Sequence, residues 1–320
     1  MHIENFKIFA DLIKTKSFSK TGKQNGLSQS AVSQQLRALE LSFNVRVLDR
    51  SQKRFHLTRE GERIHAATQE ILRTYDRLLA DIQEMRNSVN GSIRVSTILS
   101  IGLHEMPNVL RRILVDYPSV NICVEYRRSN MVLEDVEHNG ADLGLLANPD
   151  AEAMEKFAVH PFAEDKLAVI CSPRHPFAVL GAIPVEKLSG QRFISFDRDI
   201  PTQRIVEQTL LGKNVHINTI METDNIETIK RAVEAGIGIA LVPASSAQYE
   251  IQRQTLAKVD LTDAPIKRSL VVIHRKDFVL SPAMKKFIQF MVEAGKEGLE
   301  DDPVAALARQ TGAAAPALPA

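Results

Sequence analysis

The fold of this 320-residue sequence is decided by the stretch Leu27-Ser28-Gln29-Ser30-Ala31-Val32-Ser33-Gln34-Gln35-Leu36-Arg37-Ala38-Leu39-Glu40. Ser28 is suited to cap a helix. Apolar side chains then recur at helical spacing and predict a buried face made of Val32, Leu36, Leu39 and Phe43. The opposite face carries amide, hydroxyl and guanidinium groups, which hydrogen-bond base edges and phosphates in a DNA major groove: Gln29, Ser30, Ser33, Gln34 and Arg37. Many surface helices carry such residues, so only the neighbouring sequence can distinguish a DNA-reading helix from an ordinary surface helix.

Two further helices are predicted before this one. The first has an apolar stripe at i, i+3, i+4 and i+7, formed by Phe6, Phe9, Ala10 and Ile13. Ser17 and Ser19 can cap a short second helix over residues 20–24, and Gly26 permits the bend that follows it. The order therefore predicts a helix-turn-helix whose last helix is the one quoted above.

Charge is distributed unevenly along the chain. Residues 1–58 hold ten Lys and Arg against four Asp and Glu, a net charge of +6, so the remainder carries −5 to give the total of +1. Residues 50–58 predict two short strands around a turn, with Arg50, Lys53 and Arg54 at the tip, where a wing contacts backbone phosphates. Such a cationic region suits a polyanion, whereas the alternative is a solvated, lysine-rich surface.

A long helix with a seven-residue repeat follows the basic region. One set of seam positions is Ile64, Ile71, Leu78 and Met85, and a second set lies four residues later, at Thr68, Tyr75, Ile82 and Val89. This spacing predicts a helix over 59–90 that pairs with a second copy of the chain and ends at Asn90-Gly91. Packing of the helix on its own domain is the alternative, because Thr68 and Tyr75 are imperfect seam residues.

The rest of the chain alternates strands with helices. Strands are predicted at 93–98, 120–126, 141–146, 166–170, 193–196, 236–243 and 269–273, and helices at 106–117, 132–138, 226–235 and 283–294. This order predicts an α/β fold with a parallel sheet, helices on both faces and two similar halves separated by a cleft. Ligands in such sheets bind at the carboxyl ends of the strands. From residue 296 the sequence turns to Ala, Pro and Gly, which predicts a disordered tail.

Several other classes of protein are disfavoured. No apolar run approaches the ~18 residues of a membrane span, and the N-terminus lacks signal-peptide character, so we expect a cytoplasmic protein. Cys123 and Cys171 lie in apolar runs and are expected to pack as small hydrophobic residues, with a redox pair as the alternative. The nine histidines show no zinc-binding spacing, and no nucleophile–base–acid set can be assembled. We therefore expect no metal, no cofactor and no enzymatic activity.

Residues 6–72 resemble the winged helix-turn-helix and linker helix of LysR-type transcriptional regulators. The resemblance lies in segments 16–19, 27–40, 49–54 and 57–61, which occur in the family's order and spacing. Thr21-Gly22 departs from it, because two alanines are usual there. Segments 106–107, 117–118, 139–144 and 235–243 resemble the family's effector domain, which is similar in fold to type 2 periplasmic binding proteins.

The resemblance implies a domain organisation and a function. The domains would be a winged helix-turn-helix over 1–58, a linker and dimerisation helix over 59–90, an effector-binding domain over 92–295 and a disordered tail over 296–320. Within the effector domain, the first subdomain would span about 92–163 and 268–295, and the second about 164–267. The function would be sequence-specific transcriptional regulation by a homodimer or homotetramer, with double-stranded DNA, a small-molecule co-inducer and RNA polymerase as partners.

The resemblance also places three hydroxyl residues in the cleft. Ser100 follows the first strand, Ser129 follows the second, and Thr202 lies at the mouth of a helix in the inserted subdomain. A hydroxyl beside a helix N-terminus suits a carboxylate or phosphate, and Arg127, Arg128 and Arg198 would add positive charge. For each hydroxyl the alternative is an ordinary helix cap.

Two other classes of function are alternatives to this one. A transport protein could use the two-lobed body alone, and an enzyme could carry an appended helix-turn-helix. Neither explains the basic head, the seam and the cleft together. A cleft that closes on its ligand would change the distance between the two reading helices of a dimer.

Overall fold

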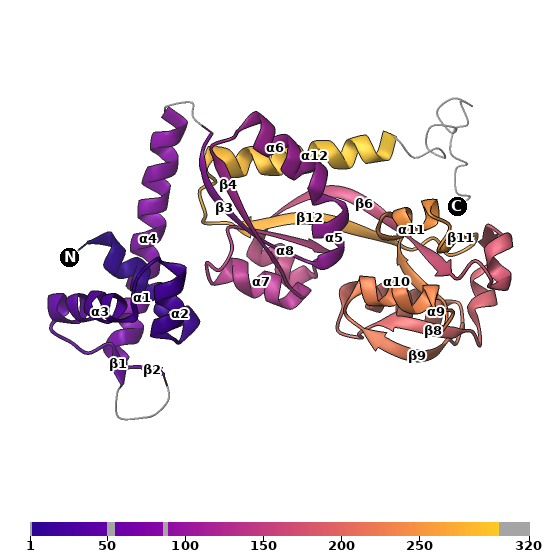
Figure 1. The fold of residues 1–320 in the computed structure, drawn as a ribbon, viewed down its shortest axis with the longest axis horizontal. Helices are drawn as coiled ribbons and strands as arrows, with labels where there is room; N and C mark the ends of the chain where they lie inside the picture. Colours follow the sequence, from indigo (N-terminus) through magenta and orange to yellow (C-terminus); the bar gives the residue numbers. More distant parts are fainter. Residues whose placement is uncertain (1, 50–54, 86–88, 301–320) are drawn as a thin grey trace. The chain divides into compact units, whose positions relative to one another are not determined.

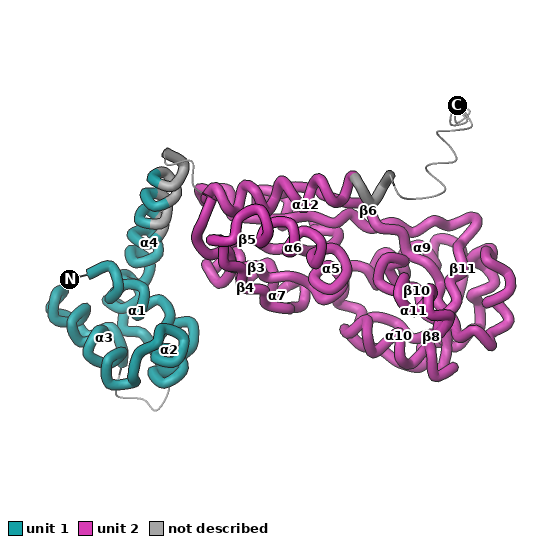
Figure 2. Tube along the Cα trace, turned by 45° about the horizontal axis from the view of Figure 1, so that its top comes forward, with its two compact units in different colours: residues 1–87 teal, residues 88–320 magenta. Residues whose placement is uncertain are grey.

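The computed structural model describes residues 2–49, 55–85 and 89–300. The chain divides into two compact units, residues 1–87 and 88–320 (Figure 2). Each unit has hydrophobic clusters of its own, and each is described separately.

The first unit is the predicted winged helix-turn-helix with a long helix. Its elements are α1 (Ile3–Thr15), α2 (Phe18–Gln24), α3 (Gln29–Phe43), β1 (Leu48–Asp49), β2 (His56–Leu57) and α4 (Arg59–Met85) (Figure 1). The strands β1 and β2 pair antiparallel, with Leu48 opposite Leu57. The core includes Phe9, Leu12 and Leu39, which are fully buried. The three helices were therefore predicted correctly, except that α2 begins earlier than residue 20. The hairpin was predicted within residues 50–58, but its first strand precedes residue 50, and residues 50–54 lie outside the described part.

Local hydrogen bonds explain the helix boundaries in this unit. The Ser17 hydroxyl accepts from the backbone N–H of Lys20, so Ser17 rather than Ser19 is the cap of α2. Ser28 caps α3 by accepting from the N–H of Ala31 at 3.1 Å. A Cβ on Gly22 would lie 2.6 Å from the carbonyl oxygen of Leu27. Glycine at this departure from the family pattern therefore lets α2 approach the turn closely.

Two expectations about side chains of the reading helix and of the seam were wrong. Phe43 was expected in the core, but it is 42 % exposed, because it lies at the end of α3 and only meets the edge of the Phe6 ring. Val89 was expected on the seam, but it is not helical and packs against a core cluster of the second unit. The described part of α4 reaches Met85, and residues 86–88 lie outside the described residues.

The seam of α4 divides into two parts. Ile64 packs against the core of the first unit, and Thr68 is fully buried, as expected for packing on the helix's own domain. Further along, Ile71, Leu78 and Ile82 are exposed, as expected for residues that meet another chain.

The second unit begins with a subdomain built on a mixed sheet. Its strands follow the order β4 (Val120–Tyr126), β3 (Gly91–Thr97), β5 (Leu143–Ala147), β12 (Lys267–Arg275) and β6 (Phe157–Cys171). On one face lie α6 (Met106–Asp116) and α12 (Pro282–Glu300), and on the other lie α7 (Ser129–Glu137) and α8 (Ala151–Lys156) (Figure 1). A short helix, α5 (Leu99–His104), follows β3.

The second subdomain is inserted between β6 and β12. Its elements are η1 (Pro176–Val179), β7 (Ala182–Ile183), η2 (Val185–Leu188), β8 (Arg192–Phe196), α9 (Pro201–Gly212), β9 (Asn218–Thr223), α10 (Ile226–Glu234), β10 (Ala240–Pro243), η3 (Ala244–Ala247), α11 (Gln248–Gln252) and β11 (Ala257–Leu261). The first part of β6 pairs with β12, and its last residues pair with β10 and β11. The strands β6 and β12 therefore connect the two subdomains (Figure 1).

The predicted parallel sheet was only partly correct. The pairs β3–β4, β3–β5 and β8–β9 are parallel, whereas β12 runs antiparallel to β5 and β6, and β10 and β11 run antiparallel to β6. The reason is that β6 leads into the second subdomain and β12 leads back. Residues 296–300, which were predicted to belong to a disordered tail, are part of α12 instead; residues 301–320 lie outside the described part.

The two cysteines lie in different subdomains. Cys123 is exposed on β4, whereas Cys171 is buried at the end of β6 in a cluster of the second subdomain. Burial raises the pKa of the Cys171 thiol to about 11, which disfavours the reactive thiolate. The packing role is therefore confirmed for Cys171, whereas the same expectation for Cys123 was wrong, because that residue lies on an exposed position of β4. None of the described helices is both long and apolar enough to cross a membrane.

Candidate functional site

The predicted DNA-reading residues share the outer face of α3. Gln29, Ser30, Gln34 and Arg37 are exposed, and Ser33 is half-buried. Ser19 donates to the side-chain oxygen of Gln29 at 3.1 Å, and the hydroxyls of Ser28 and Ser30 lie 2.8 Å apart. Within the described residues, Ser33, Gln34 and Arg37 make no side-chain hydrogen bond or ion pair, so their polar atoms are available to a ligand. The wing residues Arg50, Lys53 and Arg54 lie outside the described residues.

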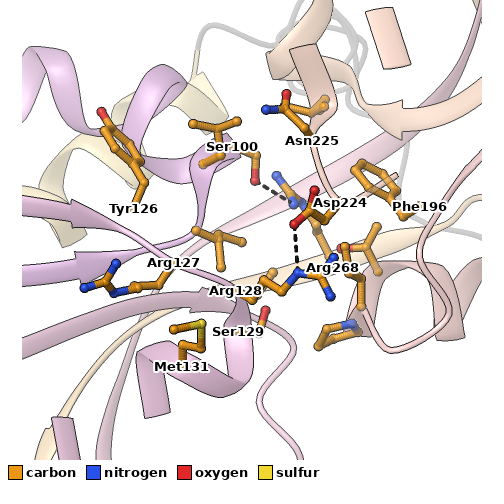
Figure 3. A pocket seen from close by; sticks show the side chains of 17 residues that line it. Ser100, Tyr126, Arg127, Arg128, Ser129, Met131, Phe196, Asp224, Asn225 and Arg268 are labelled. Carbon is orange, nitrogen blue, oxygen red and sulfur yellow. Dashed lines mark hydrogen bonds and ion pairs between the residues drawn. The ribbon is translucent and has the colours of Figure 1, made fainter. Parts of the chain in front are cut away.

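A pocket of about 450 Å³ lies between the two subdomains (Figure 3). It is lined by the residues that follow four strands, β3, β4, β8 and β9. This is the carboxyl edge of the parallel strands, where ligands of such folds bind. Ser100, Ser129 and Thr202 all line the pocket, so the fold brings the three predicted hydroxyl residues together.

The three hydroxyl residues lie in the first turns of helices and are not their caps. Ser100 is the second residue of α5, Ser129 the first of α7 and Thr202 the second of α9. The cap positions are held by Ile98, Arg128 and Ile200, and none of these side chains caps the helix that it precedes. The backbone N–H groups of these first turns, with the positive ends of the helix dipoles, therefore remain free of side-chain caps.

The other helix beside the pocket is capped by its own side chain. The Asn225 carbonyl oxygen accepts from the N–H groups of Glu227 and Thr228, at 2.9 and 3.2 Å. An N-cap of this kind satisfies the first turn of α10 without a ligand.

Thr202 is the one predicted hydroxyl residue that is both buried and unpaired among the described residues. It is 4 % exposed, lines the pocket and has no hydrogen-bond partner there.

Sequence reasoning missed a buried arginine on β12. Arg268 lines the pocket, is 3 % exposed, and donates to the hydroxyl of Ser100 at 3.2 Å (Figure 3). It also donates to Asp165 at 2.8 Å. Asp165 also accepts from the hydroxyl of Ser245 at 3.3 Å. Burial, and next the nearby Asp165, raise the pKa of Glu105 beside this group. Arg268 was missed because only β12 brings it next to Ser100, far away in the sequence.

Two further arginines of the lining have different partners. Arg127 pairs with Glu125 and with Asp135, both in the first subdomain. Arg128 binds three aspartates that follow β8 and β9 in the second subdomain: Asp197, Asp199 and Asp224. Hydrogen bonds to Asp224 and Asp197 raise the pKa of the Arg128 guanidinium. Arg198, which was expected to add charge here, is largely exposed and lies 3.6 Å from Glu222 instead of lining the pocket.

The remainder of the lining is largely apolar and aromatic. From the first subdomain come Ile98, Tyr126 and Met131, and from the second come Phe196 and Ile226 (Figure 3). A pocket with an apolar wall and a few convergent polar groups is typical of a small-molecule site. No three His, Cys, Asp or Glu side chains within residues 2–49, 55–85 and 89–300 are placed to hold a metal ion.

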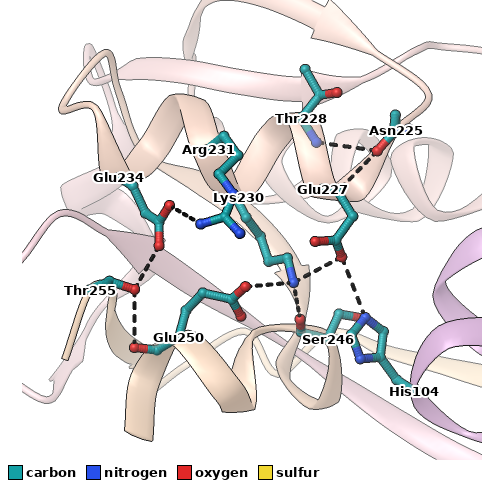
Figure 4. Close-up of polar contacts among 10 residues, drawn as sticks. All are labelled: His104, Asn225, Glu227, Thr228, Lys230, Arg231, Glu234, Ser246, Glu250 and Thr255. Atoms are coloured by element: carbon teal, nitrogen blue, oxygen red, sulfur yellow. Dashed lines mark hydrogen bonds and ion pairs between the residues drawn. The ribbon is translucent and has the colours of Figure 1, made fainter. Parts of the chain in front are cut away.

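A buried ion cluster lies on α10, whose first residue, Ile226, lines the pocket. The ammonium of Lys230 lies 2.9 Å from Glu227, 3.0 Å from Glu250 and 2.9 Å from the backbone oxygen of Ser246 (Figure 4). His104 reaches this cluster from α5 in the first subdomain, with its Nε2 3.7 Å from Glu227. Burial, and next the positive charge of Lys230, lower the pKa of His104.

Comparison with known sequences gives two family matches and many full-length relatives. The description "LysR substrate binding domain" matches residues 86–296, and "Bacterial regulatory helix-turn-helix protein, lysR family" matches residues 3–62. The chain is 28% identical to a "Probable RuBisCO transcriptional regulator" of Cyanidioschyzon merolae, covering 91% of this chain and 97% of that protein. It is 27% identical to the "HTH-type transcriptional activator CmpR" of Synechocystis, covering 90% and 94%.

Solved structures share the fold. Full-length OxyR C199D from Pseudomonas aeruginosa aligns with a TM-score of 0.72 and 18% identity, over 92% of this chain and 95% of OxyR. Full-length CbnR in complex with its target DNA aligns with a TM-score of 0.61 and 17% identity, over 92% and 100%. The regulatory domain of Synechocystis CcmR in complex with 2-PG aligns with a TM-score of 0.59 and 24% identity, over 65% and 98%.

The family matches cover both units, and the winged helix-turn-helix and the two-subdomain pocket are the parts that such a regulator requires. The family consists of transcriptional regulators and not of enzymes. This chain belongs to the LysR family of DNA-binding transcriptional regulators.

Proposed function

We propose that this regulator recognises its operator with the outer face of α3 and responds to a small anionic effector bound in the pocket between its subdomains. The observation that carries the effector proposal is the convergence of first-turn residues from three helices on one pocket, with no side-chain cap on any of those helices. A carboxylate or phosphate accepts hydrogen bonds from such N–H groups and is favoured by the helix dipole.

The side chains of the pocket support an anion. Three arginines line the pocket against one carboxylate, Asp224, and that carboxylate is held by Arg128. Thr202 offers a hydroxyl that has no protein partner among the described residues. Arg268 donates a hydrogen bond to the hydroxyl of Ser100 and so places a positive charge beside it. The apolar wall favours an effector with a compact carbon body, because a drug-sized or smaller ligand fills a pocket of this volume.

Ligands of structural relatives agree with this proposal. The CcmR regulatory domain was solved in complex with 2-PG, and the effector-binding domain of QuiR in complex with shikimate, which is a carboxylate. These ligands belong to those proteins. What supports the proposal here is that both were found on domains with the fold of residues 88–300.

The effector proposal is tested by ligand capture. The full-length protein is incubated with a metabolite extract, and the retained compounds are identified by mass spectrometry. We expect a small carboxylate or organophosphate to be enriched on wild-type protein and lost from Ser129→Ala/Thr202→Val. The control is Thr209→Val, because Thr209 lies on α9 but donates to the backbone of Ile205. Retention of neutral compounds alone, or equal retention by the double variant, would show that the anion site is wrong.

The DNA-reading proposal assigns base and phosphate contacts to Gln29, Ser30, Ser33, Gln34 and Arg37, and backbone contacts to Arg50, Lys53 and Arg54. An operator is first selected from random double-stranded DNA, and binding is then measured by mobility shift. We expect Ser33→Ala/Arg37→Ala to lose selectivity, by about 1–3 kcal/mol for each specific contact removed. Arg63→Ala, an exposed arginine on α4, is the control and should bind as wild type does. Equal affinity and selectivity in the double variant would reject α3 as the reading helix.

The exposed part of α4 supports a homodimer as the DNA-binding form. Burying Leu78 and Ile82 would contribute about 1.5–3 kcal/mol each, so Leu78→Glu/Ile82→Glu should weaken dimerisation by about 100-fold or more in analytical ultracentrifugation. Ala66→Glu, on the outer side of the repeat, is the control. An unchanged dimer in the double variant would place the interface elsewhere. A homotetramer and contact with RNA polymerase remain further predictions.

A further inference from the structure

Arg128 joins the two subdomains by ion pairs that cross the mouth of the pocket. It precedes α7 in the first subdomain, whereas its partners follow β8 and β9 in the second. Its Nε lies 2.7 Å from Asp224 (Figure 3). Its Nη1 lies 3.2 Å from Asp199, and its Nη2 donates to Asp197. These four residues are called the Arg128 cluster. One side chain thus makes three links between two bodies that also meet through β6 and β12 and through α5, where Leu99 packs against the second subdomain and His104 contacts Glu227.

The charges of the Arg128 cluster do not balance. Three carboxylates share one guanidinium, which leaves an excess of two negative charges at the mouth of a pocket that we propose for an anion. An anion that binds at the first turn of α7 lies next to Arg128, because Ser129 is the first residue of that helix. Such an anion is either repelled by the three aspartates or replaces them as the ion-pair partner of the Arg128 guanidinium.

The position of Arg128 favours the exchange. Its side chain is 39 % exposed, so its ion pairs are solvated, weak and easily replaced. The two carboxylates that hold Arg127, by contrast, belong to the same subdomain as Arg127 itself, so the pairs of Arg127 cannot hold the subdomains together. The partners of Arg128 therefore lie in the other subdomain, whereas the partners of Arg127 lie in its own.

We propose, building on the anionic effector proposed above, that Arg128 is a latch between the subdomains which an anion releases by taking its guanidinium from Asp197, Asp199 and Asp224. The freed aspartates then face the bound anion with like charge, so the second subdomain moves away from the first. The effector would open this latch, and the residue that recognises the anion is also the residue that holds the subdomains in the described arrangement.

The latch is tested by a distance measurement in the full-length protein. Spin labels are attached at Glu134→Cys on α7 and Gln208→Cys on α9, which are exposed positions on the two subdomains. Cys123 is replaced by serine, and Cys171 remains because it is buried and its thiol pKa is raised to about 11. Double electron–electron resonance then reports the distance between α7 and α9.

Without any added anion, we expect Arg128→Ala to populate a longer distance than the wild type, and Asp224→Asn to do so in part. Arg127→Ala is the matched control and should keep the wild-type distance. Raising NaCl from about 0.05 to about 0.5 M should lengthen the wild-type distance, because screening weakens exposed ion pairs. An unchanged distance in Arg128→Ala would overturn the latch. That arm needs no ligand, so its result is independent of whether the pocket binds anions.

Release is tested with inorganic phosphate and with acetate as probes, each against sodium chloride of equal ionic strength. We expect either anion to lengthen the wild-type distance and to leave Arg128→Ala unchanged. No change in the wild type, or an equal change in Arg128→Ala, would overturn release by anions. If the anions change nothing but Arg128→Ala lengthens the distance without them, the latch stands and the proposed anionic effector is wrong.

Discussion

Lys230 and Arg128 are both cations with several oxygen partners in the effector domain, yet their surroundings are opposite. The side chain of Lys230 is 3 % exposed, and its partners lie on α10, η3 and α11 of its own subdomain. Arg128 is 39 % exposed, and its partners lie across the pocket. The Lys230 cluster is therefore part of the framework of one subdomain, whereas the Arg128 cluster joins two.

The difference shows which charges can take part in a switch. Removing a buried charge from its partner leaves an uncompensated ion in a region of low dielectric constant, so the cluster stays assembled in every working state. An exposed pair loses little when water or a ligand replaces one partner. Buried clusters should therefore govern stability, and the exposed cluster should govern the response to ligand.

The largest effect is expected from Lys230→Met, which leaves Glu250 buried without its cation. We expect the free energy of unfolding to fall by about 3–5 kcal/mol, measured by urea unfolding of the full chain with circular dichroism. The double variant Lys230→Met/Glu250→Gln should regain part of the loss, because the orphaned charge is gone. A loss of unfolding free energy as small as that of the exposed control Arg231→Ala would contradict the difference between buried and exposed ion clusters.

Arg268→Met should have the next largest effect, a loss of about 3 kcal/mol in the same measurement. The loss is expected to be smaller than for Lys230 because Asp165 keeps its hydrogen bond from Ser245. The double variant Arg268→Met/Asp165→Asn should regain part of the loss, because the orphaned carboxylate is gone. No recovery in the double variant would show that packing of the Arg268 side chain, and not its charge, is what matters.

A smaller effect is expected from His104, which contacts the buried cluster from the other subdomain. Its pKa is lowered from 6.5, so below that pH the unfolded chain binds a proton that the folded chain refuses, and stability falls as pH falls. His104→Gln should reduce this acid-side loss in thermal unfolding between pH 7.5 and 5.5. His138→Gln, an exposed histidine at the end of α7, is the control. Identical pH dependence in wild type and His104→Gln would exclude His104 as a contributor.

The smallest effect on stability is expected from Arg128→Ala, despite its three ion pairs. The side chain is solvated, so its urea unfolding midpoint should stay within the experimental error of the wild type. The same variant should show the longer distance between subdomains described above. A loss of stability comparable to that of Lys230→Met would place Arg128 among the framework residues and contradict the comparison.

The parts of the fold that were predictable from sequence depend on local signals. Ser28 capped α3 as expected, and Val32, Leu36 and Leu39 were buried, because caps and helical periodicity are encoded within a few residues. Phe43 was misplaced because burial at a helix end depends on neighbours from elsewhere. The strands β10 and β12 were predicted without their antiparallel direction, because periodicity predicts a strand and not its direction, and β11 was not predicted.

The candidate pocket was predictable only in part for the same reason. Ser100, Ser129 and Thr202 were placed through the family resemblance, and the fold brings them to one pocket. Arg268 joins them from β12 and carries no local signal of a binding role. Asp224-Asn225 could have been found, because an Asp-Asn pair between a strand and an apolar helix is a capping pattern.

The central claim is that the state of the pocket determines how the reading helices meet DNA, and a nuclease footprint on the selected operator tests it most directly. Wild type, Arg128→Ala and Arg127→Ala are compared at equal occupancy. The account predicts that Arg128→Ala changes the length of protected DNA and that Arg127→Ala leaves it as in the wild type, because Arg128 pairs with the other subdomain and Arg127 pairs within its own. Identical footprints from all three proteins, with a longer subdomain distance in Arg128→Ala, would contradict it.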